Sequence, residues 1–474
     1  MSFAHSEPIS HPRIKSLEVL LGMAALGFLL IGAFLLPIPM LYWYDDGVYF
    51  LGAVRIVAGD RPYSDFYLAH PPGVTWMTAI VVKLGGGIVA SRAVFWSLAA
   101  AFAVVFARFL ERVQVSKELA LSTAWLGVFM LSATRLYMQA DSQILTHLPG
   151  MTMTLIGFFF LLPGRLSPVS AGLWLASATV FRIQFAFVGP AWVAFLLATY
   201  GWSAGRGPIL RLAGTALLAL IAFHGGMQLL YSDYFKCVLM AHLGRTTTPL
   251  GEKFGIFADL FREPQIAFGL IASAILATTG RGATRGLGAF ALAEVTLTLI
   301  GSRFLMEAYF LPTYPYMLGN GALFLAGVAE QKGAWRVYLP VILVVATLSG
   351  IPLVRTASYR LSVQRSFEED LIQRVRFVPG RTVACTAGKI PYYAGKQLVN
   401  DYLCPDTTSP INSDFGPWFV SMVRRADLAV ITDSALKDLK PADCREIVAV
   451  GRPIIFGTPV DEAEFRRRTS EGTR

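Results

Sequence analysis

The sequence carries little charge, because Asp, Glu, Lys and Arg together make up only 15% of its 474 residues. Soluble domains carry about a quarter. Metal-site spacings such as HExxH and CxxC are missing, and the run Gly85-Gly86-Gly87 is not framed by a strand and a helix as a nucleotide loop is. No internal repeat and no cleavable signal peptide is visible, since the first apolar run, 17–39, is longer than a signal sequence. These absences argue against a soluble metalloenzyme and against a soluble nucleotide-binding enzyme.

The sequence is instead strongly apolar, with 54% hydrophobic residues, a mean hydropathy of +0.54, and 33 Phe, 17 Tyr and 9 Trp. Together with 43 Gly and 26 Pro, this composition is typical of a polytopic, all-α bundle of lipid-facing helices. The net charge of +10 could suggest a nucleic-acid partner, but the 41 Lys and Arg lie mostly at the ends of apolar runs. An excess of positive residues on the cytoplasmic side explains that pattern, and we expect no nucleic acid.

The apolar runs predict about eleven membrane crossings, each needing about 20 residues. Arg13 and Lys15 place the N-terminus in the cytoplasm, so the first span, 17–39, delivers segment 45–73 to the outer face. We expect a short interfacial helix in that segment and, after it, an apolar stretch too short to cross. Further spans are expected at 90–110, 118–138, 146–163, 168–182, 184–200, 210–231, 264–279, 286–301, 311–329 and 335–353. An odd number of crossings puts the C-terminus outside.

The composition turns polar near residue 354 and divides the chain into a membrane domain, 1–353, and a small α/β domain, 354–474, on the periplasmic side. Apolar clusters alternate there with loop and helical stretches. They lie at 382–385, 428–431, 447–450 and 454–456. The charged tail, 462–474, is expected to be disordered.

Three of the four cysteines, Cys385, Cys404 and Cys444, fall in this polar region. An extracytoplasmic domain allows one disulfide among them and leaves one thiol. Cys385 lies in an apolar cluster and is expected to be a buried thiol, so we expect the disulfide to join Cys404 to Cys444.

Acidic residues suggest chemistry on the outer face. Asp45 and Asp46 directly follow the first span, where one Asp would suffice to cap an interfacial helix and a second adds repulsion. A general base that removes a proton from an acceptor hydroxyl is the sharper interpretation. Asp141 lies six residues after Arg135 on the same face, either as a loop salt bridge or as part of a donor or acceptor site.

Ionisable residues at the outer ends of spans suggest an anionic substrate. Arg182 lies between two expected helices, and Arg303 opens a segment that also contains Tyr309. Snorkelling to lipid head groups explains any single cation, but several cations beside paired acids suggest a phosphate-bearing lipid. His70 precedes Pro71 and Pro72, which either sets the chain geometry alone or places the ring on a phosphate.

The motif Tyr44-Asp45-Asp46-Gly47-Val48-Tyr49, followed by Ala58-Gly59-Asp60-Arg61-Pro62-Tyr63 and by His70-Pro71-Pro72-Gly73, resembles the first external loop of the C-type membrane glycosyltransferases. This superfamily includes protein O-mannosyltransferases and lipid A aminoarabinose transferases, with many bacterial relatives. Three later pieces agree in order, namely Arg135 with Asp141, Phe181-Arg182, and Tyr309-Phe310-Leu311-Pro312. The resemblance covers roughly residues 1–350.

The resemblance implies an enzyme of the bacterial inner membrane that transfers a sugar from a polyprenyl-phosphate donor, with inversion, on the periplasmic face. The acceptor would be a cell-envelope glycan, lipid or protein. Asp45 would be the base with Asp46 in support, and Arg182 would bind the donor phosphate. His70 stands before Pro71 and Pro72, where members of this superfamily more usually have a Lys. Such an enzyme needs no nucleotide loop or metal cage. Metal dependence varies across the superfamily, and Asp45, Asp46 and Asp141 could together hold a divalent cation.

Two other functions remain open at this stage. A transporter or flippase for lipid-linked sugars would also have many spans and buried cations, but such proteins often show repeat symmetry and broken midplane helices, and neither is visible here. An inactive relative could serve as a scaffold subunit of a glycan assembly complex. The joint presence of Asp45, Asp141 and Arg182 argues weakly against that function.

Overall fold

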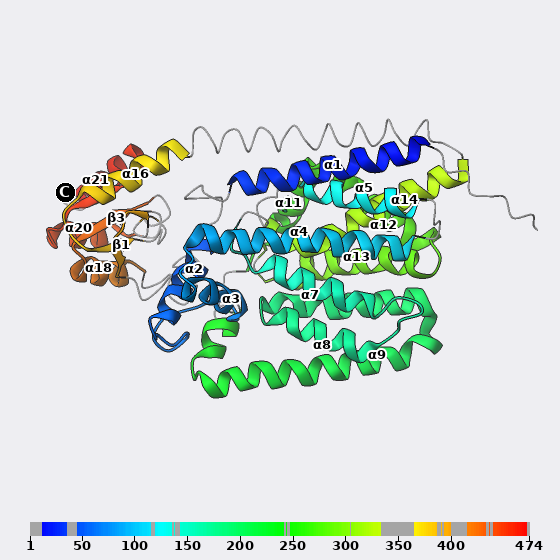
Figure 1. Ribbon diagram of the computed structural model, residues 1–474. Coiled ribbons are helices and arrows are strands. Elements are labelled where there is room, and N and C mark those ends of the chain that lie inside the picture. Colours follow the sequence, from blue (N-terminus) through cyan, green and yellow to red (C-terminus); the bar gives the residue numbers. More distant parts are fainter. Residues whose placement is uncertain are drawn as a thin grey trace, which may run out of the picture.

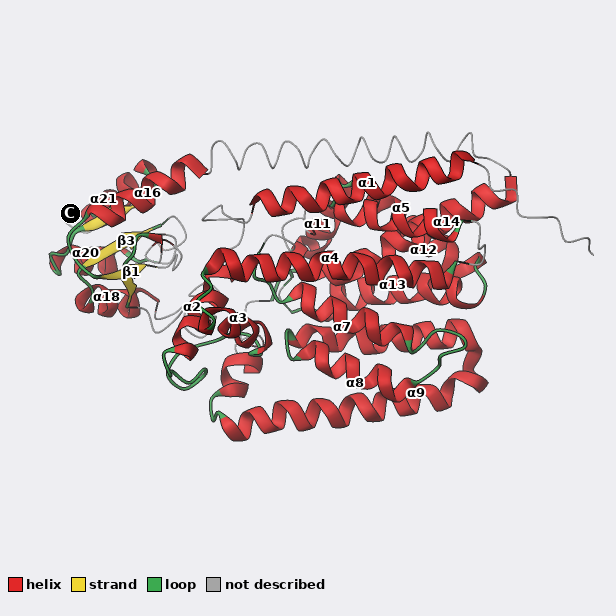
Figure 2. Ribbon diagram, viewed as in Figure 1, coloured by secondary structure: helices red, strands yellow, loops and turns green. Residues whose placement is uncertain are grey.

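The computed structural model describes residues 12–35, 45–114, 119–134, 137, 143–240, 243, 247–303, 305–332, 365–385, 390, 393–399, 415–432, 436 and 439–471. Within these ranges the chain is mostly helical, with one small parallel sheet near the C-terminus (Figures 1 and 2). The larger part is a bundle of helices, and the sheet belongs to a separate small domain at one end of that bundle.

The bundle is built from the apolar runs, each of which buries one side against its neighbours. Phe158 lies at the centre of the core, where the rings of Phe109, Phe195, Phe290 and Tyr316 pack around it at centroid distances of 4.7–5.5 Å. The bundle helices are α1 (Pro12–Leu35), α4 (Ile88–Val113), α5 (Ala120–Ser132), α7 (His147–Phe159), α8 (Pro168–Thr179), α9 (Val188–Leu230), α11 (Leu250–Asp259), α12 (Pro264–Thr279), α13 (Gly282–Gly301) and α14 (Tyr314–Lys332).

Most of these helices overlap the expected spans, whereas α11 lies between two of them and was not predicted. The two spans expected at 184–200 and 210–231 correspond to two helical segments, which α9 joins across a kink at Gly201. Gly201 has a φ of +73°, a left-handed conformation that breaks the helical path and that glycine adopts without strain. The expected span 335–353 lies outside the described residues.

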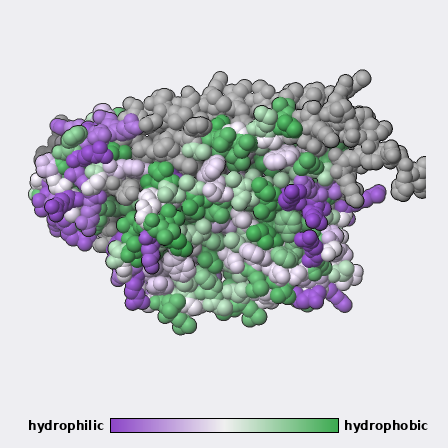
Figure 3. All heavy atoms as spheres, in the orientation of Figure 1, coloured by the Kyte–Doolittle hydropathy of each residue, from purple (hydrophilic) through white to green (hydrophobic). Residues whose placement is uncertain are grey.

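Apolar side chains face outward along the bundle, as they do where lipid is the solvent. On α9, for example, Leu218 is 71% exposed and Leu229 is 90% exposed. Figure 3 shows hydrophilic residues at both ends of the molecule and mostly apolar residues between them. Among the described residues, three helical segments are long and apolar enough to cross a membrane, and the bent pair 250–262 and 264–279 could make a fourth. The number of eleven crossings therefore stays a prediction.

Two short helices follow the first span, as the sequence predicts. These are α2 (Asp45–Val57) and α3 (Gly73–Lys83), which pack on one another at one end of the bundle (Figure 1). The N–H of Gly73 donates to the carbonyl of Val180 at 3.0 Å. A Cβ on Gly73 would lie 2.7 Å from that oxygen, so only glycine lets α3 dock on the end of α8.

The C-terminal domain is a four-stranded parallel sheet with strand order β2-β1-β3-β4. Its strands are β1 (Thr382–Cys385), β2 (Gln397–Leu398), β3 (Leu428–Ile431) and β4 (Ile454–Phe456), and its helices are α16 (Arg365–Phe377), α18 (Phe415–Arg425), α20 (Pro441–Ala449) and α21 (Pro459–Ser470). The domain lies at the same end of the bundle as α2 and α3 (Figure 1), and its Leu398 packs against an apolar cluster that includes residues of α2 and of the loop after it.

Two sequence predictions for this domain need correction. The tail expected to be disordered forms α21, because Thr458 and Asp461 make a reciprocal capping box and Phe465 is buried against the sheet. The predicted disulfide between Cys404 and Cys444 is also wrong, since Cys444 is a free, buried thiol. Cys385 is a buried free thiol in β1, which confirms that expectation, and Cys404 lies outside the described residues.

The buried thiols are expected to be unreactive in the folded protein. Burial raises the pKa of both Cys237 and Cys444 to about 11, so the nucleophilic thiolate is scarce at neutral pH. Iodoacetamide at pH 7.5 should leave both peptides unmodified in mass spectra of the native protein and label them after denaturation. Rapid labelling of either peptide in the native protein contradicts this packing.

Candidate functional site

Arg182 lies where α8 ends and the chain turns toward α9. The backbone of Arg182 is extended, and a short 3₁₀ helix, η1 (Ile183–Phe187), follows it. This break in the helix brings the guanidinium inside the bundle instead of out to lipid, and Arg182 is only 7% exposed. The sequence predicts a cation at this junction, and the structure buries it.

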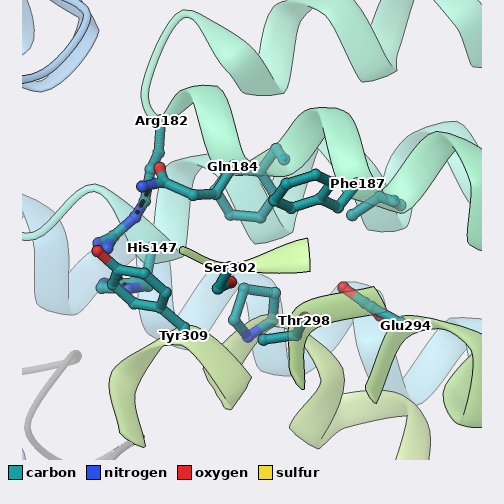
Figure 4. A pocket seen from close by; sticks show the side chains of 11 residues that line it. His147, Arg182, Gln184, Phe187, Glu294, Thr298, Ser302 and Tyr309 are labelled. Atoms are coloured by element: carbon teal, nitrogen blue, oxygen red, sulfur yellow. Dashed lines mark hydrogen bonds between the residues drawn. The ribbon is translucent and has the colours of Figure 1, made fainter. Parts of the chain in front are cut away.

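Four neighbours hold the Arg182 guanidinium in place. Nε donates to Gln184 at 3.1 Å, and Nη1 donates to the hydroxyl of Thr146 at 3.2 Å and to Nε2 of His147 at 2.8 Å. Since arginine can only donate, Nε2 of His147 is the unprotonated ring nitrogen. The guanidinium also lies over the ring of Tyr309, with Cζ 4.8 Å from the centroid (Figure 4).

All four neighbours are neutral. Among the residues that the structure describes, no carboxylate forms an ion pair with Arg182. A buried cation without a counter-charge is unfavourable unless an anion completes it. The arrangement therefore suits an anionic ligand.

A small cavity lies beside this cation, with a volume of about 20 Å³, the size of one water molecule. Polar residues from the last part of α13 and its C-terminal cap also line it, namely Glu294, Thr298 and Ser302, which follow one another at helical spacing (Figure 4). Lys253 on α11 is a second buried cation near it, because its Nζ donates to the carbonyl of Ser302.

The sequence analysis did not identify His147, Lys253 or Glu294. Glu294 interrupts an apolar run, and an ionisable residue inside a span is a functional candidate by default, so that signal was available. His147 lies at the start of an apolar run and Lys253 lies between two runs, so neither gives such a signal, and only the folded chain brings them to Arg182 or Ser302.

Asp46 forms a buried ion pair with Arg92 on α4. Nε of Arg92 lies 2.7 Å from the Asp46 carboxylate, and both side chains are fully buried. This partner was not predicted, because the two residues lie far apart in the sequence. The pair fixes the start of α2 against the bundle, and the same element begins with Asp45, whose side chain lies outside the described set.

Removal of one member of this pair should be costly. We expect Arg92→Gln to lower the free energy of unfolding by about 3–5 kcal/mol, because it leaves the Asp46 charge buried without its partner. Arg108→Gln on the same helix is the matched control, since its pair with Glu111 is exposed and is worth about 0–1 kcal/mol. Thermal stability in detergent measures both, and equal stability of the two variants contradicts the assignment.

The loop between α2 and α3 is braced by its own motif residues. Arg55 pairs with Asp60 at 2.7 Å, and the N–H of Arg61 donates to Asp65 at 2.7 Å. Tyr63 has a φ of +66°, which is unusual for a residue other than glycine. Burial raises the pKa of Tyr63 well above its usual value, so its hydroxyl stays protonated and donates to the carbonyl of His70 at 2.8 Å.

His70 is therefore held by its backbone, and its ring is buried at 7% exposure beside Tyr49. The adjoining Gly73 contact places this segment against the turn that carries Arg182. A phosphate contact by His70 stays a prediction, and the structure explains only its position.

The structure does not place the remaining predicted site residues, Arg303, Arg135 and Asp141, beside Arg182. Arg303 is exposed and is absent from the cavity wall, because its guanidinium donates to Thr247 at 3.0 Å and to the carbonyl of Leu243. It ties two loops together. Arg135 and Asp141 lie outside the described residues.

A divalent cation receives no support from the described part of the chain, in which no group of three His, Cys, Asp or Glu is close enough to hold one. Of the three acids expected to hold it, Asp46 is paired with Arg92, while the side chain of Asp45 and the whole of Asp141 lie outside the described residues, so the cation stays a prediction.

Comparisons with known proteins bear on the fold. No family model matches the sequence, and no curated protein matches it. Among solved structures, ArnT from Cupriavidus metallidurans bound to undecaprenyl phosphate aligns with a TM-score of 0.58 at 15% identity, covering 80% of this chain and 85% of that chain. Its apo state gives the same values. The Archaeoglobus fulgidus oligosaccharyltransferase in complex with Zn and sulfate has a TM-score of 0.47 at 13% identity, covering 83% of this chain and 62% of that chain.

The chain has the fold of ArnT. ArnT is a lipid A aminoarabinose transferase of the C-type superfamily, so the fold expected from the loop motifs is confirmed. At this level of identity the likeness concerns the fold, and the chemistry is argued from the residues of this chain.

Proposed function

We propose that the protein is a membrane glycosyltransferase that moves a sugar from a polyprenyl-phosphate donor to a cell-envelope acceptor. The observation that carries this proposal is the buried Arg182, held by neutral partners at the end of the bundle and lacking a described counter-charge. The phosphodiester of such a donor supplies that charge, and its oxygens can accept two parallel hydrogen bonds from a guanidinium. The ArnT structure, which shares this fold, contains undecaprenyl phosphate.

The proposed reaction is a single displacement with inversion. Asp45 takes the proton of the acceptor hydroxyl, the resulting oxygen attacks the anomeric carbon, and the bond from that carbon to the phosphate oxygen breaks. The departing phosphate keeps the electron pair, and its charge is stabilised by Arg182. Asp46 does not compete as the base, because it is engaged with Arg92.

The cavity beside Arg182 is too small for a phosphate, so donor binding requires a local opening. Tyr309 covers the guanidinium from a short 3₁₀ helix, η4 (Glu307–Thr313), which is the natural element to move. In this proposal the N-terminus is cytoplasmic, the domain that follows residue 353 is periplasmic, and the membrane is the bacterial inner membrane.

Transfer and transport are separated by a bond-formation assay. The protein is reconstituted in vesicles with a radiolabelled polyprenyl-phosphate sugar and an envelope extract as acceptor. Label in an acceptor fraction, together with released polyprenyl phosphate, is the expected result. Movement of the intact donor across the bilayer without bond formation identifies a flippase, and neither event identifies a scaffold subunit.

A further inference from the structure

A second polar region lies at the opposite end of the bundle from Arg182. Several helices have one end at each region. Helix α7 runs from His147, beside Arg182, to Phe159, and α13 runs from Gly282 to Gly301, beside the first cavity. Gly282 lines the second region and Ser302 lines the first cavity, and the two residues lie twenty positions apart along α13 and its C-terminal cap, about 30 Å at 1.5 Å per residue. That distance is close to the thickness of the hydrocarbon layer, about 30 Å, so the two regions lie about one membrane thickness apart.

This second region contains a cavity of about 590 Å³. Three connections converge on it, and each contributes an arginine: Arg112 at the end of α4, Arg165 in the turn before α8, and Arg281 at the start of α13. In the described part of the chain, no carboxylate pairs with any of these three, whereas the nearby Arg108 is paired with Glu111 at 2.8 Å. Three cations around one hollow make a site of strong positive potential.

Two further features of the cavity specify the ligand. The first turn of α13, from Gly282 to Thr284, lines it, and Arg281 makes no side-chain cap there, so the free N–H groups of a helix start add to the positive potential. The other wall is apolar and includes Phe159, Leu162 and Val113. A charged rim with an apolar wall fits a phosphate ester that carries hydrocarbon better than it fits a free phosphate ion.

We propose that this cavity binds the head group of an anionic phospholipid, with Arg112, Arg165 and Arg281 around the phosphate. The general excess of positive charge on the cytoplasmic side explains why arginines occur at this end, but it does not explain a hollow lined by three of them. Arg206, Arg211 and Arg285 are exposed, as are the three cavity arginines, but they do not line the cavity. The site is independent of Arg182 and of the proposed transfer reaction.

The test compares two triple variants with equal loss of charge. R112Q/R165Q/R281Q removes the cavity arginines, and R206Q/R211Q/R285Q is the matched control. Lipid-depleted protein in neutral detergent is titrated with phosphatidylglycerol, phosphatidylcholine or inorganic phosphate, and binding is followed by native mass spectrometry and by Tm. We expect wild type and control to bind one phosphatidylglycerol, and the cavity variant to bind it at least about tenfold more weakly.

Further variants control for misfolding, and the comparison of ligands identifies the source of the anion. R112K/R165K/R281K keeps the charge and should recover most of the affinity, and R165Q alone should weaken binding about two- to fivefold if the triple variant is unstable. Equal losses in the cavity and control triples contradict the proposal. Equal stabilisation by phosphatidylcholine and by phosphatidylglycerol also contradicts it. The same holds if inorganic phosphate saturates the site at the concentrations at which phosphatidylglycerol does.

Discussion

Asp45→Asn should lower the rate of sugar transfer by about 10²–10⁴-fold while donor binding persists, because the amide keeps the shape of the carboxylate but cannot accept the acceptor's proton. Asp45 is the first residue of α2 and lies beside the fixed pair of Asp46 and Arg92, so the backbone that carries the base is well anchored. Initial rates with the radiolabelled donor measure the effect.

Two controls separate the base from the fold. Asp259→Asn changes an exposed carboxylate and should leave transfer unchanged. Asp46→Asn should retain more transfer than Asp45→Asn but lose stability, because it breaks the buried pair. Normal turnover by Asp45→Asn refutes the assignment of the base.

Arg182→Ala should lose about 10²–10³-fold in transfer and also bind the donor more weakly. The same charge that holds the phosphate in the ground state stabilises it as it departs. Arg182→Lys should be partly active, because a lysine keeps the charge but loses the bidentate geometry. Rates and donor affinity are measured on the same preparations.

The alternative is that Arg182 serves only to hold η1 and α7 together through Gln184, Thr146 and His147. In that case Arg182→Ala lowers Tm and leaves the rate per folded molecule unchanged. Arg262→Ala, an exposed arginine 81% accessible, is the control for loss of one positive charge. A destabilised Arg182→Ala protein with unchanged catalysis removes the phosphate role.

Much of the bundle is predictable because apolar runs of sufficient length have few alternatives. The runs at 264–279 and 286–301 become α12 and α13 with almost the same limits. The two spans expected at 184–200 and 210–231 lie on either side of the kink in α9. The residue at the kink was not predictable, because Gly201 is one of 43 glycines and nothing local marks it as one with a left-handed φ. The tail 459–470 had usable signals, Pro459 and the capping pair Thr458 and Asp461, which its high charge obscured.

The candidate site is only partly predictable for a physical reason. Arg182 is recognisable because a cation between two apolar runs is rare. Its partners His147 and Tyr309 come from other helices, and Arg92 reaches Asp46 across the fold, so these contacts depend on tertiary packing. Arg303 illustrates the reverse error, since its position in the sequence resembles that of Arg182 but its guanidinium binds loop atoms.

The most direct test of the central claim is a structure of the protein with undecaprenyl phosphate bound. The account predicts phosphate oxygens within about 3 Å of the Arg182 guanidinium, with the ring of Tyr309 moved from its present place over that group. A phosphate bound elsewhere, with Arg182 still closed on His147 and Thr146, contradicts it.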